Sequence, residues 1–157
     1  MTRSWPTRVV FGVTLALGAV VLAAAPASAH IEPDPSRVEP GAAATVAFNV
    51  EHGCDTSPTT SLTFKIPKGV KDVAPEAKDE WSSKLKGKTV VFEDGLLAAN
   101  TEDQFAISFK APNKKTILVW KVVQRCQEGT IRWIDTSAGA EEPPPRVGVG
   151  KNPPAEG

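Results

Sequence analysis

Short segments in which apolar and polar residues alternate, separated by glycine and proline, are the feature that most limits the possible folds of this chain. A period of two is the pattern of a β-strand with one buried face. Beyond the first 29 residues, no segment shows a persuasive helical period. The predicted strands cover residues 44–50, 59–67, 88–93, 104–110, 117–126 and 131–135, with a further edge strand at 146–149. The series predicts an all-β chain that folds as a single-domain antiparallel β-sandwich.

Two segments show no alternation. Residues 31–41 contain several prolines, which predicts an extended entry segment ending in a turn at Pro40-Gly41. Residues 72–83 are predicted to be irregular, with Trp81 anchoring them at the edge of the core.

The longest predicted strand, 117–126, places alternate residues from Leu118 to Cys126 on one face. Residues 127–130 then form a predicted hairpin turn, in which Gly129 is suited to a positive φ.

The first 29 residues have the pattern of a cleaved signal peptide. Arg3 and Arg8 give a basic start, residues 9–25 are almost wholly apolar, and Ala27-Ser28-Ala29 provides the small residues of a cleavage site. The alternative is an uncleaved membrane anchor, although the apolar run is shorter than the roughly 20 residues of a spanning helix. Cleavage after Ala29 makes His30 the first residue of the mature protein.

The expected organisation is therefore a signal peptide at 1–29, one β-sandwich domain at 30–149 and a flexible tail at 150–157. Basic and acidic residues are balanced, at 18 each, and removal of the leader leaves a mildly acidic mature chain. That balance argues against nucleic acid or an anionic membrane as a partner. We expect a protein that is secreted or held at the exterior of the cell envelope.

The two cysteines, Cys54 and Cys126, predict one disulfide, because an even count in an exported chain favours oxidation. The competing interpretation is a thiolate metal site. Both the oxidising compartment and the wide spacing count against that alternative.

A histidine at a free N-terminus is a bidentate nitrogen ligand, because its amine and its ring Nδ1 close one chelate ring on the same metal. Nitrogen donors of this kind favour copper, which heads the affinity order and accepts tetragonal geometry. The hypothesis for His30 is therefore Cu(II) binding. The alternative is that a histidine follows the cleavage site incidentally.

Several motifs in order resemble the bacterial YcnI-type family over nearly all of the mature domain. They are the leader end Ala-x-Ala-His, the mature start His30-Ile31-x-Pro33, Ser57-Pro58-Thr59-Thr60, Ile66-Pro67-Lys68-Gly69-Val70, Trp120-Lys121 and Trp133. The resemblance implies an exported immunoglobulin-like or cupredoxin-like β-sandwich that binds Cu(II) as a copper chaperone or sensor. It also implies an ion held by the N-terminal histidine and an acidic side chain, with a tryptophan close by.

His30 matches the family's N-terminal histidine, and Trp133 is the match for its tryptophan, expected to wall one face of the site. The acidic ligand does not carry over, because its position falls on Gly53. The neighbouring His52 is the candidate replacement, since imidazole suits copper at least as well as carboxylate. Glu51 and Asp135 are weaker candidates for the remaining ligands and Glu32 is weaker still, with water also open.

The leading functional hypothesis is a non-enzymatic Cu(II)-binding protein that exchanges the ion with a membrane copper transporter or another copper-handling protein. One rival is a histidine-brace copper oxidase or monooxygenase. Such enzymes commonly use an axial tyrosine, and the chain has no tyrosine. The second rival is an extracellular interaction module in which His30 binds no metal.

Overall fold

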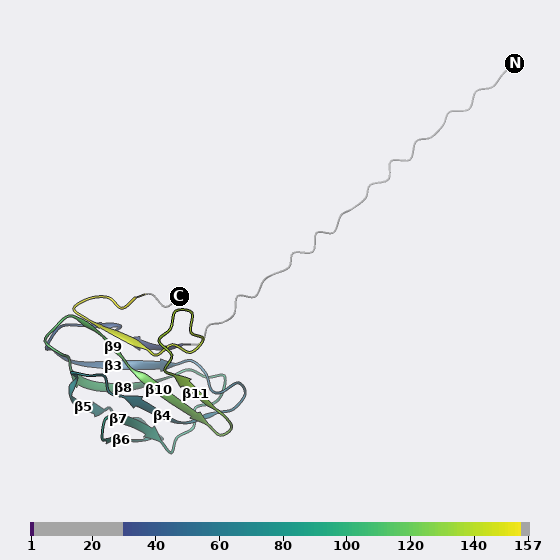
Figure 1. Ribbon diagram of the computed structural model, residues 1–157. Helices are drawn as coiled ribbons and strands as arrows, with labels where there is room; N and C mark the ends of the chain where they lie inside the picture. Colours follow the sequence, from purple (N-terminus) through teal and green to yellow (C-terminus); the bar gives the residue numbers. More distant parts are fainter. Residues whose placement is uncertain (2–29, 155–157) are drawn as a thin grey trace.

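The computed structural model describes Met1 and residues 30–154, and the order of the strands can be followed in Figure 1. The predicted signal peptide falls on residues outside the described part of the chain, apart from Met1. Within the described part all regular structure is strand: β1 (Ile31–Asp34), β2 (Arg37–Val38), β3 (Ala43–Val50), β4 (Thr59–Lys65), β5 (Lys71–Pro75), β6 (Ser82–Lys86), β7 (Thr89–Glu93), β8 (Asp103–Lys110), β9 (Thr116–Val119), β10 (Lys121–Cys126), β11 (Thr130–Trp133) and β12 (Arg146–Val149). No helix long and apolar enough to cross a membrane occurs among these residues.

The strands form three sheets. A four-stranded sheet has the order β1-β3-β8-β5, a five-stranded sheet has the order β11-β10-β4-β7-β6, and a small sheet has the order β2-β12-β9. Every pairing is antiparallel except that of β2 with β12. The predicted all-β antiparallel sandwich is confirmed.

Aromatic side chains fill the space between the two larger sheets. Phe48 on β3 and Phe64 on β4 are fully buried, with ring centroids 5.0 Å apart. Phe92 on β7 meets Phe105 on β8 at 5.3 Å. Phe48, Phe64 and Phe105 occupy alternate buried positions of β3, β4 and β8, whereas Phe92 lies in β7, where three consecutive residues are buried. Burial of a side chain of this size contributes about 2 to 3 kcal/mol to the free energy of folding, so these rings supply much of the stabilisation between the two sheets.

The predicted strand 117–126 is two strands rather than one. β9 pairs with β12 in the small sheet, whereas β10 pairs with β4 and β11 in the five-stranded sheet. The break falls at Trp120, whose backbone N–H donates to the Pro145 carbonyl at 3.0 Å. Trp120 is fully buried and its indole contacts Phe48 and Phe109, each at a centroid distance of 5.4 Å. The chain therefore changes sheets at a core residue without losing its inward and outward alternation.

The prediction of irregular structure over residues 72–83 was wrong, because β5 and the start of β6 lie there. Their pairing explains the missing pattern. The ladder of β5 with β8 shifts register between Lys71 and Ala74, which breaks the alternation. Most residues of β6 are exposed, so that strand carries no apolar period.

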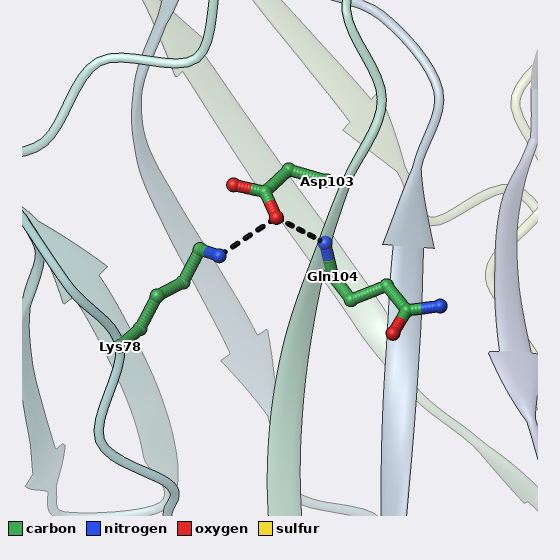
Figure 2. Close-up of polar contacts among 3 residues, drawn as sticks. All are labelled: Lys78, Asp103 and Gln104. Carbon is green, nitrogen blue, oxygen red and sulfur yellow. Dashed lines mark hydrogen bonds and ion pairs between the residues drawn. The ribbon is translucent and has the colours of Figure 1, made fainter.

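Trp81 does anchor the connection from β5 to β6, since its ring packs edge-on against Phe105 at 4.9 Å. The same connection is tied by polar contacts at the start of β8 (Figure 2). The Asp103 carboxylate accepts a hydrogen bond from Lys78 Nζ at 2.7 Å and another from the Gln104 backbone N–H at 2.8 Å. Lys78 Nζ also lies 4.9 Å from the centre of the Phe105 ring.

The predicted entry segment contains β1 and β2, which pair with β3 and β12. The prolines correctly indicated extended backbone there, but they gave no sign of the pairing. β12 was predicted at an edge, and it is instead the central strand of the small sheet.

The predicted disulfide is present. Cys54 and Cys126 are joined across a sequence separation of 72 residues. The bond ties the loop after β3 to the end of β10. The Cys54 backbone N–H donates to the Ser57 carbonyl at 3.0 Å and also lies 3.0 Å from the Cys126 sulfur.

Replacing both cysteines with serine is expected to lower the free energy of unfolding by about 4 kcal/mol, because the bridge closes a long loop in the unfolded chain. Urea unfolding followed by tryptophan fluorescence measures the loss. Reduction of the unmodified protein is the control and should give a similar loss. A change below about 1 kcal/mol would show that the unfolded chain is not restrained by this bridge.

Candidate functional site

The pairing of β1 with β3 fixes where the two histidines lie. Ile31 is paired with Val50 at the end of an antiparallel ladder. His30 precedes β1 directly, and His52 follows the end of β3 by two residues. Both histidines therefore emerge at the same end of the β1–β3 pair. One further step along this ladder would set His30 against Glu51.

His52 is half-buried and faces Trp133. The two rings have a centroid distance of 6.3 Å and an interplanar angle of 57°. The ring Nδ1 is hydrogen-bonded to the Gly53 carbonyl oxygen. Because a carbonyl can only accept, Nδ1 carries the proton and Nε2 keeps the lone pair that a metal would use.

A buried amide, that of Gln124, holds this arrangement together. Its Oε1 accepts a hydrogen bond from the Trp133 indole N–H at 2.9 Å. Its Nε2 donates to the His52 carbonyl at 2.6 Å and to the Thr59 hydroxyl at 2.8 Å. The orientation of the amide is fixed by its partners, since an indole N–H only donates and a carbonyl only accepts. Gln124 thus connects β10, β11, β4 and the loop that carries His52.

The loop after β3 has no space for a side chain at Gly53. The Gly53 N–H donates to the Ala99 carbonyl at 2.9 Å. A Cβ at this position would lie 2.2 Å from the Ser57 carbonyl oxygen. An acidic ligand at position 53, where the family resemblance would place it, is therefore incompatible with this loop.

His30 lines a surface groove of about 430 Å³ with Glu32, Pro33, Ser36, Arg146, Pro153 and Pro154. The residues come from β1, the turn that follows it, the start of β12 and the segment after β12. Arg146 has a buried Nε without a hydrogen-bond partner. Sequence reasoning did not associate Arg146 with His30, because their presence in one groove depends on how the small sheet packs against β1.

Asp135 serves as a turn cap. Its carboxylate accepts hydrogen bonds from the Ser137 backbone N–H at 2.9 Å and from the Ser137 hydroxyl at 2.7 Å. These bonds, with a smaller attraction from Lys121, lower the pKa of the Asp135 carboxyl. The structure therefore gives this carboxylate a local role and does not bring it into a ligand cluster.

The structure brings His52 and Trp133 into ring contact and sets His30 at the same end of the sandwich. Within the described residues, no group of three or more histidine, cysteine, aspartate or glutamate side chains is placed to hold a metal ion. Sequence reasoning missed the role of Gln124. The available signal was a polar residue on the inward, otherwise apolar face of a predicted strand.

Comparisons with known proteins identify a family and a fold. A family model described as a domain of unknown function, DUF1775, matches residues 30–90 and 84–149. No curated protein matches the chain significantly. An uncharacterized protein from Nocardia farcinica with an immunoglobulin-like fold is 18% identical, with 76% of this chain and 97% of that chain covered and a TM-score of 0.65. The seventh ScaB type I cohesin from Pseudobacteroides cellulosolvens is 14% identical, with 82% and 94% covered and a TM-score of 0.46.

Replacing Gln124 with leucine is expected to lower the free energy of unfolding by about 3 kcal/mol, because the Trp133 indole N–H, the His52 carbonyl and the Thr59 hydroxyl lose their partner. Urea unfolding measures the change. The matched control is Gln104→Leu at an exposed side chain, which should cost about 0.5 kcal/mol or less. Equal losses in the two variants would contradict the role assigned to the Gln124 amide.

Proposed function

The chain belongs to the DUF1775 family, a domain of unknown function, and on that premise we propose that it is an exported Cu(II)-binding protein that takes up or delivers the ion. The proposal does not involve catalysis. The partner in the exchange is a membrane copper transporter or another copper-handling protein, and the site of action is the exterior of the cell envelope.

The observation that carries the proposal is the position of His30 relative to the first ladder pair. Only this residue lies between the predicted cleavage site and Ile31, which is 1% exposed and paired with Val50. Cleavage after Ala29 would therefore place a new amine at the end of a hydrogen-bonded ladder, and not on a loose tail. The amine and Nδ1 of His30 would then bind one ion as a chelate.

His52 supplies a further nitrogen in this proposal. The hydrogen bond from Nδ1 to Gly53 orients the ring, as outer contacts of metal-bound histidines commonly do. Trp133 is no ligand, since its indole N–H is engaged by Gln124. Its ring lies beside His52 and would shield one side of the ion from water.

The donor set fits Cu(II) by its chemistry. Two imidazoles and one amine are nitrogen donors, which copper binds most tightly among the common divalent ions. The described side chains supply no cluster of three ligands. The α-amine of the processed chain is therefore the donor on which the proposed site depends, with water completing the coordination.

Calorimetric titration of Cu(II) into protein that begins at His30 is expected to show one tight equivalent. The matched control is the same protein with one methionine before His30, in which the amine becomes an amide. We expect its affinity to fall by at least tenfold, because one chelating nitrogen is lost. Equal affinity of the two proteins would contradict the chelate.

Replacing His52 with alanine in the processed protein is expected to change the paramagnetic resonance spectrum of bound Cu(II), because one nitrogen ligand would be lost. Glu51→Gln tests the neighbouring carboxylate in the same way. Asp135→Asn is the control and should leave the spectrum unchanged, since that carboxylate is bound to Ser137. A His52→Ala spectrum identical to that of the unmodified protein would remove His52 from the ligand set.

A further inference from the structure

The outer face of the five-stranded sheet carries a two-dimensional array of basic side chains. Residues directly opposite each other in a ladder share a face, so the registers define the array. One row is Lys121, Lys65, Thr89 and Lys86, the next is Arg132, Val123, Thr63, Val91 and Lys84, and a third contains Thr130, Arg125 and Ser61. The basic residues of this array all have exposed side chains, and we call the surface the basic face: Lys65, Lys84, Lys86, Lys121, Arg125 and Arg132.

Acidic residues are nearly absent from the same strands. Glu93 is the one carboxylate in the five strands of this sheet, and it forms an ion pair with Lys84. Asp94 lies near Lys84, and Asp135 lies near Lys121, both at the margin of the face. The interior of the basic face thus has cations without compensating anions.

The opposite outer face of the sandwich differs. On the four-stranded sheet, Glu32 and Asp34 lie on β1, and Lys71 and Lys110 lie at the far end of the β5–β8 ladder. The residues between them are small or uncharged, namely Thr45, Ala47, Asn49, Ala74, Gln104, Ala106 and Ser108. The two acidic and two basic residues named on this face balance each other, whereas the basic face has an excess of positive charge.

We propose that the basic face docks on an anionic phospholipid surface. Strands in a sheet lie about 4.8 Å apart, so five strands spread these charges over about 19 Å. Rows two residues apart are separated by about 7 Å, which gives the array a second dimension. Separate charges spread over a plane match a plane of lipid headgroups, whereas a single polyanion strand would engage only one row.

Docking in this way has a consequence for the candidate site. Arg125 and Arg132 lie on β10 and β11, the strands that also carry Gln124 and Trp133 on their inward face. When the protein is docked, the β10–β11 hairpin would therefore lie beside the membrane. The inference goes beyond copper binding and stands without it, because it rests on the distribution of charge alone.

The test is sedimentation of the protein beginning at His30 with vesicles that mix phosphatidylglycerol and phosphatidylcholine, compared with vesicles of phosphatidylcholine alone. We expect binding to the anionic vesicles at low ionic strength and release as salt is added. Each basic residue near such a surface contributes about fivefold to partitioning, so the double variant K65Q/K121Q should bind about 25-fold more weakly.

The matched control is K71Q/K110Q, which removes the same two charges from a cross-strand pair on the other sheet. It should bind like the unmodified protein, and thermal unfolding checks that both variants fold. Equal weakening by the two double variants would overturn the proposal, as would equal binding to neutral vesicles. Binding to polyglutamate without binding to phosphatidylglycerol vesicles would also overturn it and would assign the face to an acidic polymer.

Discussion

The geometry of the candidate site depends on one buried amide. Gln124 offers two donors and one acceptor in a single plane, and the structure uses them for the His52 carbonyl, the Thr59 hydroxyl and the Trp133 indole. Glutamate would repel the carbonyl and leucine would satisfy none of the three groups, so the position requires this amide. The Cys54–Cys126 bond acts on the same loop two residues away from His52. A polar network and a covalent bridge therefore restrain the same short segment.

The core supports this restraint because inward and outward residues continue to alternate where the chain passes from the small sheet to the five-stranded sheet. β9 and β10 belong to different sheets, yet Leu118, Trp120 and Val122 are all buried. Trp120 occupies the crossing point and contacts aromatic rings of the four-stranded sheet. Had the break shifted the alternation by one residue, Gln124 would point outward and the network behind Trp133 would be lost.

Much of the fold could be predicted from the sequence in strands that have one buried face and one exposed face. In β3, β4 and β8 the apolar and polar residues alternate cleanly, and the predicted bounds agree with the structure within two residues. β5 and β6 were missed because a register shift and general exposure erase that pattern. The sheet break at Trp120 was also missed, because a continuous alternation contains no sign of which sheet each half joins.

The sequence was enough to name the candidate ligands, but not the side chains that hold them in place. His30, His52 and Trp133 were identified from the leader, the loop and the family resemblance. The position of Arg146 in the same groove as His30 depends on packing between sheets, which no short-range pattern encodes. For Gln124, the inward position was evident from the alternation of the strand, but its three hydrogen-bond partners were not.

Net charge alone does not describe the surface that this protein presents, and the strand registers explain why. The sequence balances 18 basic residues with 18 acidic ones, which argued against an anionic surface as partner. The strands of the five-stranded sheet nevertheless contain Glu93 as their one carboxylate and expose six basic side chains. Electrostatic attraction to a surface depends on the charges within about a Debye length of it, roughly 10 Å at moderate salt. The charge on the face that approaches a partner, and not the net charge of the whole chain, therefore determines which partner the protein can bind.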